Sequence, residues 1–124
     1  MKTIITSAMW GLLLVVAACS KSRLKEEERI TGGDPVKGKE DIVRYGCPAC
    51  HEIPDIPTAR SRVGPSLRNI VAQQYLAGQL PNTPDNMARW IRTPQEIRTN
   101  STMPDLGLSD EEARDITAYL YSLP

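Results

Sequence analysis

The sequence predicts a small all-α domain, and three observations support this class. The chain has 124 residues, which is enough for one compact domain and little more. Apolar residues recur at three- and four-residue spacing near both ends of the globular part, as they do in helices with one buried face. No stretch alternates apolar and polar residues over a useful length for a strand. The chain has two Trp and no Phe, so a large apolar cofactor would help to fill the core.

Charge excludes one class of partner. The chain has 15 basic and 15 acidic residues, and this balance gives no support for a nucleic-acid partner. The middle of the chain is nevertheless basic, and this segment could help docking on an acidic protein surface. The arginines of that segment are Arg60, Arg62, Arg68, Arg89, Arg92 and Arg98.

Residues 1–18 have the pattern of an export signal. Lys2 precedes an apolar run, residues 8–18, that is too short for the roughly 20 residues that span a bilayer. The run is therefore interpreted as the core of a signal peptide. There are two alternatives to lipoprotein-type processing. The signal peptide could be cleaved at an ordinary site nearby, or the segment could remain as an uncleaved membrane anchor. All three interpretations place the domain outside the cytoplasm.

The end of this run resembles the lipobox of bacterial lipoproteins. Ala17 and Ala18 immediately precede Cys19, and in that family the cysteine becomes the lipidated first residue. The resemblance implies a lipid on Cys19 that anchors the domain to a bacterial membrane on its periplasmic side. Ser20 after the cysteine favours the outer membrane weakly. The polar residues that follow predict a flexible tether over residues 19–33, part of which could be a short helix.

The globular part, residues 34–124, is predicted to begin and end with helices. Asp34 and Pro35 supply an N-cap carboxylate and a proline at the first helical position. Val36, Ile42, Val43 and Tyr45 mark one apolar side of this first helix. Gly38 interrupts it, and a close crossing by another helix is the expected reason, because glycine costs up to about 1 kcal/mol in a helix interior.

The last helix has the clearest signals. Ser109 and Glu112 form a capping box, and apolar residues follow at helical spacing. Between the two ends the sequence predicts a proline-rich loop (52–65), a helix (66–78), a turn (81–84) and a short helix (85–92). Long loops in a compact domain usually wrap something or carry function.

The segment "YGCPACHEIP" contains Cys47, Cys50 and the only histidine, His51. A redox dithiol of the thioredoxin kind is expected after a strand, and this motif follows a predicted helix. A structural zinc site needs four nitrogen or sulfur ligands, and only these three are available outside the export signal. Haem attachment needs no further cysteine, since two thiols form thioethers and the histidine binds iron. The context therefore favours haem.

Several motifs in order resemble the class I c-type cytochromes. "GDPVKGKEDIVRYGCPACH" is similar to the first helix and haem-binding sequence of that family, "RVGPSL" to the loop that follows, and "MPDLGLSDEEARDITAYL" to the distal-ligand loop and last helix. The resemblance covers residues 33–124. It implies a small cytochrome c fold, in which the first and last helices cross and loops wrap one covalent haem c.

The resemblance also assigns residues. It makes Cys47 and Cys50 the thioether positions and His51 the proximal iron ligand, with the Pro65 carbonyl accepting a hydrogen bond from its imidazole. Met103 corresponds to the distal iron ligand. The contact between the first and last helices corresponds to Gly38, Ile42, Ile116 and Tyr119. The haem pocket corresponds to Trp90, Ser101 near a propionate, and, as further propionate partners, Tyr75, Arg60 and Arg62.

With both axial positions filled, iron has no site for a substrate, so the resemblance implies a one-electron carrier and no enzyme. Its expected partners are a quinol-oxidising complex and a terminal oxidase or reductase of a respiratory chain. One alternative is an open-site haem protein, a peroxidase or gas sensor, in which Met103 does not ligate. Another is an electron-relay subunit of one complex. An extra residue near Gly46, and Pro54 and Pro57 in the next loop, depart from shorter family members and leave partner choice open.

Overall fold

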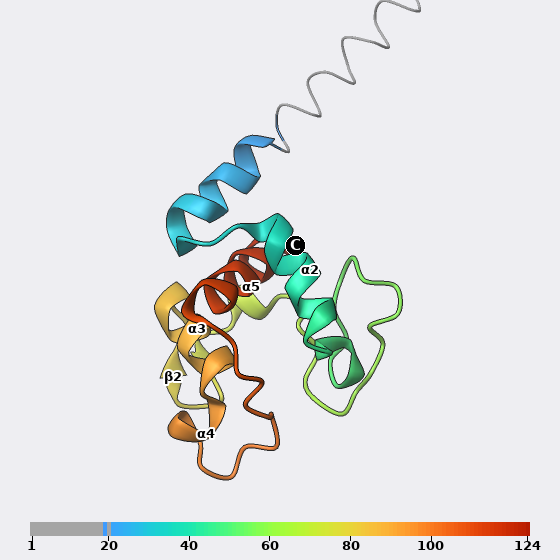
Figure 1. Cartoon of the computed structure of the whole chain (residues 1–124), viewed down its shortest axis with the longest axis vertical. Helices are drawn as coiled ribbons and strands as arrows, with labels where there is room; N and C mark the ends of the chain where they lie inside the picture. Colours follow the sequence, from blue (N-terminus) through green and yellow to red (C-terminus); the bar gives the residue numbers. More distant parts are fainter. Residues whose placement is uncertain (1–18, 20) are drawn as a thin grey trace, which may run out of the picture.

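The computed structural model describes residue 19 and residues 21–124, so the predicted signal segment and Ser20 lie outside the described residues. Helices dominate this part of the chain, which confirms the all-α class (Figure 1). Residues 21–31 are helical. The elements that follow are α2 (Pro35–Arg44), η1 (Cys47–Ala49), η2 (Ile70–Ala72), β1 (Tyr75–Leu76), β2 (Leu80–Pro81), α3 (Pro84–Arg92), α4 (Pro94–Ile97) and α5 (Asp110–Ser122).

Helix α2 begins as its sequence predicts. The Asp34 carboxylate accepts hydrogen bonds from the backbone N–H groups of Val36 and Lys37, and a proline occupies the first turn. The predicted apolar face is only partly correct. Ile42 is buried, whereas Val36 and Val43 are 57% and 52% exposed. These two valines lie off the face that α5 covers, so their apolar character did not indicate burial.

Gly38 lies where α2 crosses α5, as expected from its place inside a helix. A Cβ atom at Gly38 would be 1.8 Å from the carbonyl oxygen of Asp115. A side chain of any size is therefore excluded from this crossing. Around it, Ile42, Ile116 and Tyr119 are buried, and the contact predicted between the first and last helices is present.

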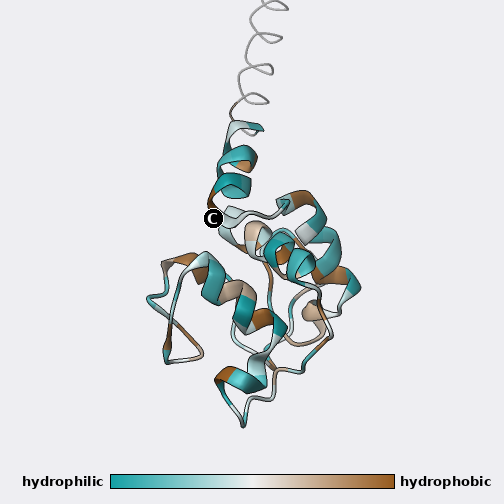
Figure 2. Cartoon of the chain, turned by 60° about the vertical axis from the view of Figure 1, so that its left-hand side comes forward, coloured by the Kyte–Doolittle hydropathy of each residue, from teal (hydrophilic) through white to brown (hydrophobic). Residues whose placement is uncertain are grey.

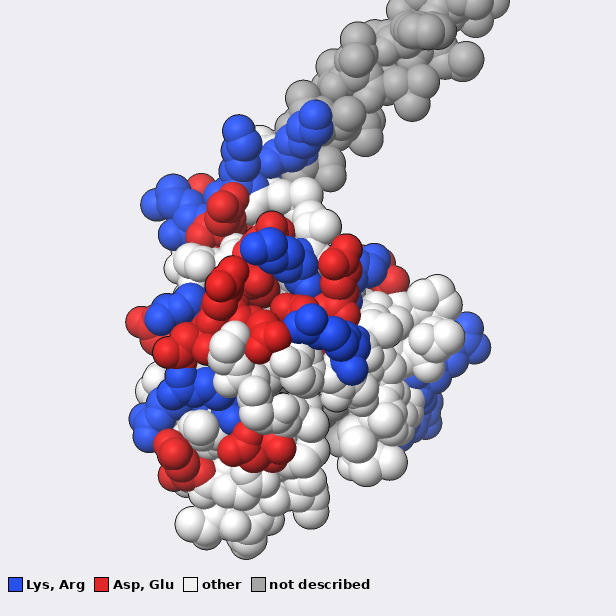
Figure 3. Space-filling model, in the orientation of Figure 1, with Lys and Arg blue, Asp and Glu red and all other residues white. Residues whose placement is uncertain are grey.

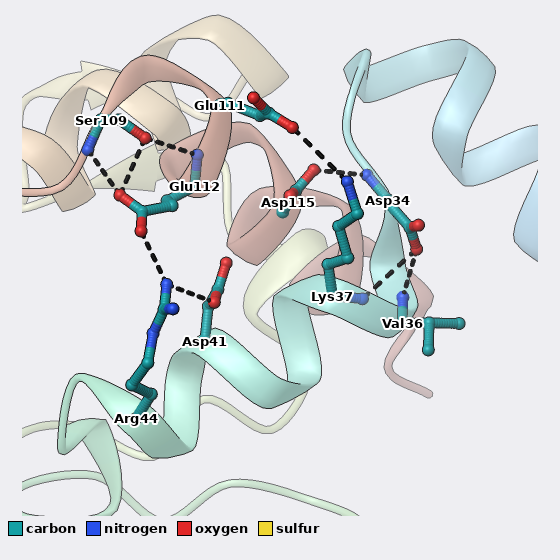
Figure 4. Close-up of polar contacts among 9 residues, drawn as sticks. All are labelled: Asp34, Val36, Lys37, Asp41, Arg44, Ser109, Glu111, Glu112 and Asp115. Carbon is teal, nitrogen blue, oxygen red and sulfur yellow. Dashed lines mark hydrogen bonds and ion pairs between the residues drawn. The ribbon is translucent and has the colours of Figure 1, made fainter.

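Charged side chains join the same two helices along their edge (Figure 4). The Arg44 guanidinium is 2.7 Å from Asp41 on its own helix and 2.6 Å from Glu112 on α5. The Tyr45 hydroxyl donates to Glu112 at 2.8 Å. Glu112 also completes the capping box of α5, because its carboxylate accepts hydrogen bonds from the backbone N–H and the hydroxyl of Ser109. These bonds, those from Ser109 first, lower the pKa of Glu112 to about 2.

This depressed pKa predicts a specific loss of stability in acid. Because the folded-state pKa lies below the ordinary value of 4.5, charged Glu112 stabilises the fold above about pH 4.5, and the stabilisation disappears as pH falls towards 2. Replacing Glu112 with Gln should lower the thermal midpoint at pH 7 but not at pH 2. Thermal unfolding of both proteins at a series of pH values measures this difference. A difference independent of pH would contradict the assignment.

The core gathers between α2, α3 and α5, and the helices carry hydrophilic and hydrophobic residues side by side (Figure 2). Met87 and Ile91 of α3 contribute to it with 2% and 5% of their surface exposed. Leu76 belongs to it from the short strand β1. The apolar residues at helical spacing near the end of the chain are buried, as predicted: Ala113, Ile116 and Leu120 in α5, and Leu123 directly after it.

The predicted helix over residues 66–78 is wrong. Asn69 has a left-handed backbone with φ of 55°, and the η2 turn that follows is only three residues long. The Asn82 side chain then donates to the carbonyls of Ile70 and Gln73, at 2.8 Å each. The segment ends in a small antiparallel pair of strands, β1 and β2, which the sequence did not indicate. Hydrogen bonds from a residue just outside the segment therefore override the local helical pattern.

Part of the predicted tether is helical, a possibility that the sequence left open. Residues 21–31 form this helix, and the residues that follow it pack closely against α5. Thr31 is 5% exposed, and a Cβ at Gly33 would be 2.2 Å from the carbonyl oxygen of Arg114. The backbone N–H of Asp34 donates to the Asp115 carboxylate at 2.7 Å. Within the described part of the chain, no helix has the length and apolar character needed to cross a membrane.

Candidate functional site

The cysteines of the sequence motif lie in a tight turn directly after α2. Gly46 takes a left-handed backbone with φ of 76°, which ends the helix, and η1 begins at Cys47. The backbone N–H groups of Cys50 and His51 both donate to the Cys47 carbonyl, at 3.1 and 3.0 Å. This turn brings both half-buried thiols and the histidine together, and neither thiol is in a disulfide.

The His51 ring is held from two sides by the next loop. Its Nδ1 is 2.7 Å from the Pro65 carbonyl oxygen, the hydrogen bond that the family resemblance implied. Because a carbonyl can only accept, Nδ1 carries the proton and Nε2 keeps its lone pair for a metal. The ring also lies against Gly64, where a Cβ would be 2.6 Å from the imidazole Cε1. Gly64 is fixed in turn, since its N–H donates to the Cys50 carbonyl at 2.7 Å.

Sequence reasoning missed Gly64 as a functional position. It stands in the "RVGPSL" motif, next to the proline to which a role was assigned. A glycine beside the proline whose carbonyl was predicted to bind the imidazole was the available signal. Its missing side chain is what lets the imidazole lie flat against the loop.

The environment of Cys47 weakens the redox alternative. Burial raises the pKa of the Cys47 thiol to about 11. Catalytic dithiols need the opposite shift, because the thiolate is the nucleophile. In the described residues there is also no group of three or more His, Cys, Asp or Glu side chains arranged to hold a metal ion.

Met103 lies in the segment between α4 and α5, which has no helix or strand. The residue is half-buried. Its backbone N–H donates to the Ser101 hydroxyl at 3.2 Å, and its carbonyl accepts a hydrogen bond of 2.6 Å from the side chain of Gln95 on α4. Ser101 was predicted as a propionate contact. Its hydroxyl hydrogen is still available for that bond.

The other predicted pocket residues are less closely tied to this site. Trp90 is half-buried on α3 and packs against the hydrophobic core. Tyr75 is 56% exposed on strand β1. Arg60 donates to the Pro57 carbonyl at 2.9 Å, within its own loop, and Arg62 is exposed. The structure thus brings together the motif with Pro65, and Ser101 with Met103.

The site residues fit a covalently bound haem. Two free thiols and an imidazole with an available Nε2 are the donor set that such a group requires. The loop after Cys50 and the segment that carries Met103 lie on two sides of the end of the molecule remote from residues 21–31 (Figure 1). Figure 3 shows that the surface between them is hollowed and largely uncharged. An apolar macrocycle would be suited to such surroundings.

Comparison with known proteins gives a consistent result. The family model described as Cytochrome c matches residues 36–124. The chain is 35% identical to cytochrome c2 of Rhodopila globiformis over 104 residues, which cover 73% of this chain and 94% of that protein. It is also 32% identical to cytochrome c oxidase subunit 2 of Alkalihalophilus pseudofirmus over 88 residues, and 30% identical to the same subunit of a Bacillus strain over 95 residues.

These relatives are covered to different extents. The matches to the two oxidase subunits take in 70% and 73% of this chain but span only 25% and 27% of those proteins. No solved structure matches the chain.

Proposed function

Because this chain belongs to the cytochrome c family, we propose that His51 and Met103 are the two axial ligands of its one covalent haem. The chain is a haem-based electron carrier, with Cys47 and Cys50 in the attachment motif. Haem supplies one-electron exchange between ferric and ferrous iron. The residues that hold the haem control that exchange.

The observation that carries the proposal is the fixed orientation of His51. The Pro65 carbonyl holds the proton on Nδ1 and so directs the Nε2 lone pair to the iron. Met103 is the complementary donor. Its backbone N–H and carbonyl are both hydrogen-bonded. It lies in an irregular segment, where core packing gives little reason for a methionine side chain. A thioether ligand favours ferrous iron and raises the potential relative to harder ligands.

We further propose that the carrier works on the periplasmic side of a bacterial membrane. Cys19 is exposed at the start of the described helix, and a lipid there would anchor the domain. The likeness to oxidase subunits favours a terminal oxidase as the electron acceptor, and a quinol-oxidising complex is the proposed donor. Mass spectrometry of the mature N-terminus tests the anchor, because an unmodified Cys19 would reject it.

Replacing Met103 with Ala tests the ligand assignment. In the wild-type ferric protein we expect a low-spin visible spectrum with the weak far-red band of methionine ligation. In the Met103→Ala protein the haem should remain covalently bound, since the attachment motif is unchanged, but the far-red band should be lost and the iron should become high-spin. Met87→Leu is the matched control, because Met87 is buried in the core at 2% exposure.

Two outcomes would reject His/Met ligation. One is a high-spin wild-type spectrum that shifts readily with added ligands, which would support the open-site alternative. The other is a normal low-spin spectrum with its far-red band in the Met103→Ala protein. That result would assign the sixth ligand to another residue.

A further inference from the structure

The segment that carries Met103 has few ties to the rest of the molecule. Residues 102–108 have no regular secondary structure. Leu106 and Leu108 attach its far end to the hydrophobic core. Among the hydrogen bonds of the described residues, only that from the Gln95 side chain joins residues 102–108 to a helix. The position of Met103 therefore depends on few contacts.

Gln95 is itself well placed to hold a fixed position. It belongs to α4, whose first residue, Pro94, is among the most fully buried side chains of the protein. The other end of α4 is tied down as well, because the side chain of Gln79 donates to the Ile97 carbonyl. The amide of Gln95 thus extends from a supported turn to the Met103 carbonyl, at 2.6 Å.

Two side chains consequently restrain the same residue. Gln95 donates to the Met103 carbonyl, while Ser101 accepts from the Met103 N–H. Both backbone polar groups of Met103 are therefore hydrogen-bonded to side chains, although Met103 itself lies in no helix or strand. Fixing these two groups restricts the directions in which the Met103 side chain can extend.

We propose that Gln95 is a positioning residue that holds Met103 in the orientation needed to bind iron. This inference rests on the proposed His/Met ligation. The bond from Gln95 resists the opening of the segment, and opening must precede replacement of Met103 by an external ligand. Gln95 should therefore control how fast such a ligand enters, and not whether haem is attached.

The experiment measures the binding of imidazole to the ferric, haem-loaded protein. Gln95→Leu removes the donor, and Gln95→Glu keeps the shape but offers only acceptors to the Met103 carbonyl. In both variants we expect the imidazole association rate to rise by about threefold to tenfold, which corresponds to the loss of one hydrogen bond. The matched control is Gln74→Leu, at an exposed glutamine outside α4, and its rate should equal that of the wild type.

The far-red band of each protein distinguishes a failure of the Met103 ligation from a failure of the role of Gln95. A wild-type protein without this band overturns the ligation, and the role of Gln95 with it. A wild-type protein with the band, and unchanged imidazole rates in both Gln95 variants, overturns the role of Gln95 alone. If Gln95→Leu does not take up haem, Gln95→Glu carries the test, and a wild-type rate in that variant has the same meaning.

Discussion

Replacing Gly38 with Ala should unfold the protein at a temperature roughly 10–20 °C lower than the wild type. The added Cβ would collide with the backbone of Asp115, 1.8 Å away, and a backbone cannot move aside as a flexible side chain can. Helices α2 and α5 would have to separate, and the core around Ile42 and Ile116 would open. Overpacking of this kind costs about 2–3 kcal/mol or more.

The expected destabilisation is opposite in sign to the usual effect of Gly→Ala in a helix. At an exposed position inside a helix, Gly→Ala stabilises a protein by up to about 1 kcal/mol, because alanine is the better helix former. Destabilisation at Gly38 can therefore be attributed only to the crossing. Thermal unfolding of the haem-loaded protein measures it, with Lys39→Ala on the exposed side of α2 as the control. A Gly38→Ala protein as stable as the wild type would show that the helices do not cross here.

Replacing Gly64 with Ala should have its largest effect on haem loading. The new Cβ would be 2.6 Å from Cε1 of His51 and 2.9 Å from Nδ1, so the imidazole has to leave its place against the loop. That movement also disturbs the bond to the Pro65 carbonyl. Changes in such supporting contacts typically weaken metal binding about 10- to 100-fold. We expect the yield of haem-loaded protein to fall by about tenfold.

The control for Gly64 separates collision from backbone strain. Gly78 has φ of 77° and open space around it, so Gly78→Ala introduces strain without any contact. That variant should load haem as the wild type does. Haem content per protein, from the absorbance of the pyridine complex, compares the two. Full loading of Gly64→Ala with an unchanged spectrum would mean that Gly64 does not orient His51.

Local signals predicted those parts of the fold that local chemistry determines. The cap at Asp34, the capping box of Ser109 and Glu112, and the buried positions of α5 follow from side chains within a few residues. The segment 66–78 failed for the opposite reason. Its carbonyls are satisfied by Asn82, which local periodicity cannot reveal. In the same way, the exposure of Val36 and Val43 depends on which face α5 covers.

The residues of the candidate site also fall into two groups, those that the sequence could predict and those that it could not. The motif residues and Met103 could be predicted as candidates because a covalent cofactor needs particular chemical groups at particular places. Gly64 and Gln95 were not predicted, because Gly64 leaves room for the imidazole through a missing side chain, and the role proposed for Gln95 depends on its distance from a carbonyl. Both are properties of the assembled loops. Sequence spacing gave no indication of Gln95, and for Gly64 the only signal was its place beside Pro65.

The helix over residues 21–31 sets the distance between the two ends of this segment. Eleven helical residues span about 16 Å, and a random chain of the same length would average nearly the same distance, about 17–20 Å. The helix therefore leaves the mean separation almost unchanged and narrows its spread. The segment is therefore a spacer of nearly fixed length, whereas a random chain would vary in length. With the lipid proposed on Cys19, a spacer of this kind would hold the domain at a nearly constant distance from the membrane.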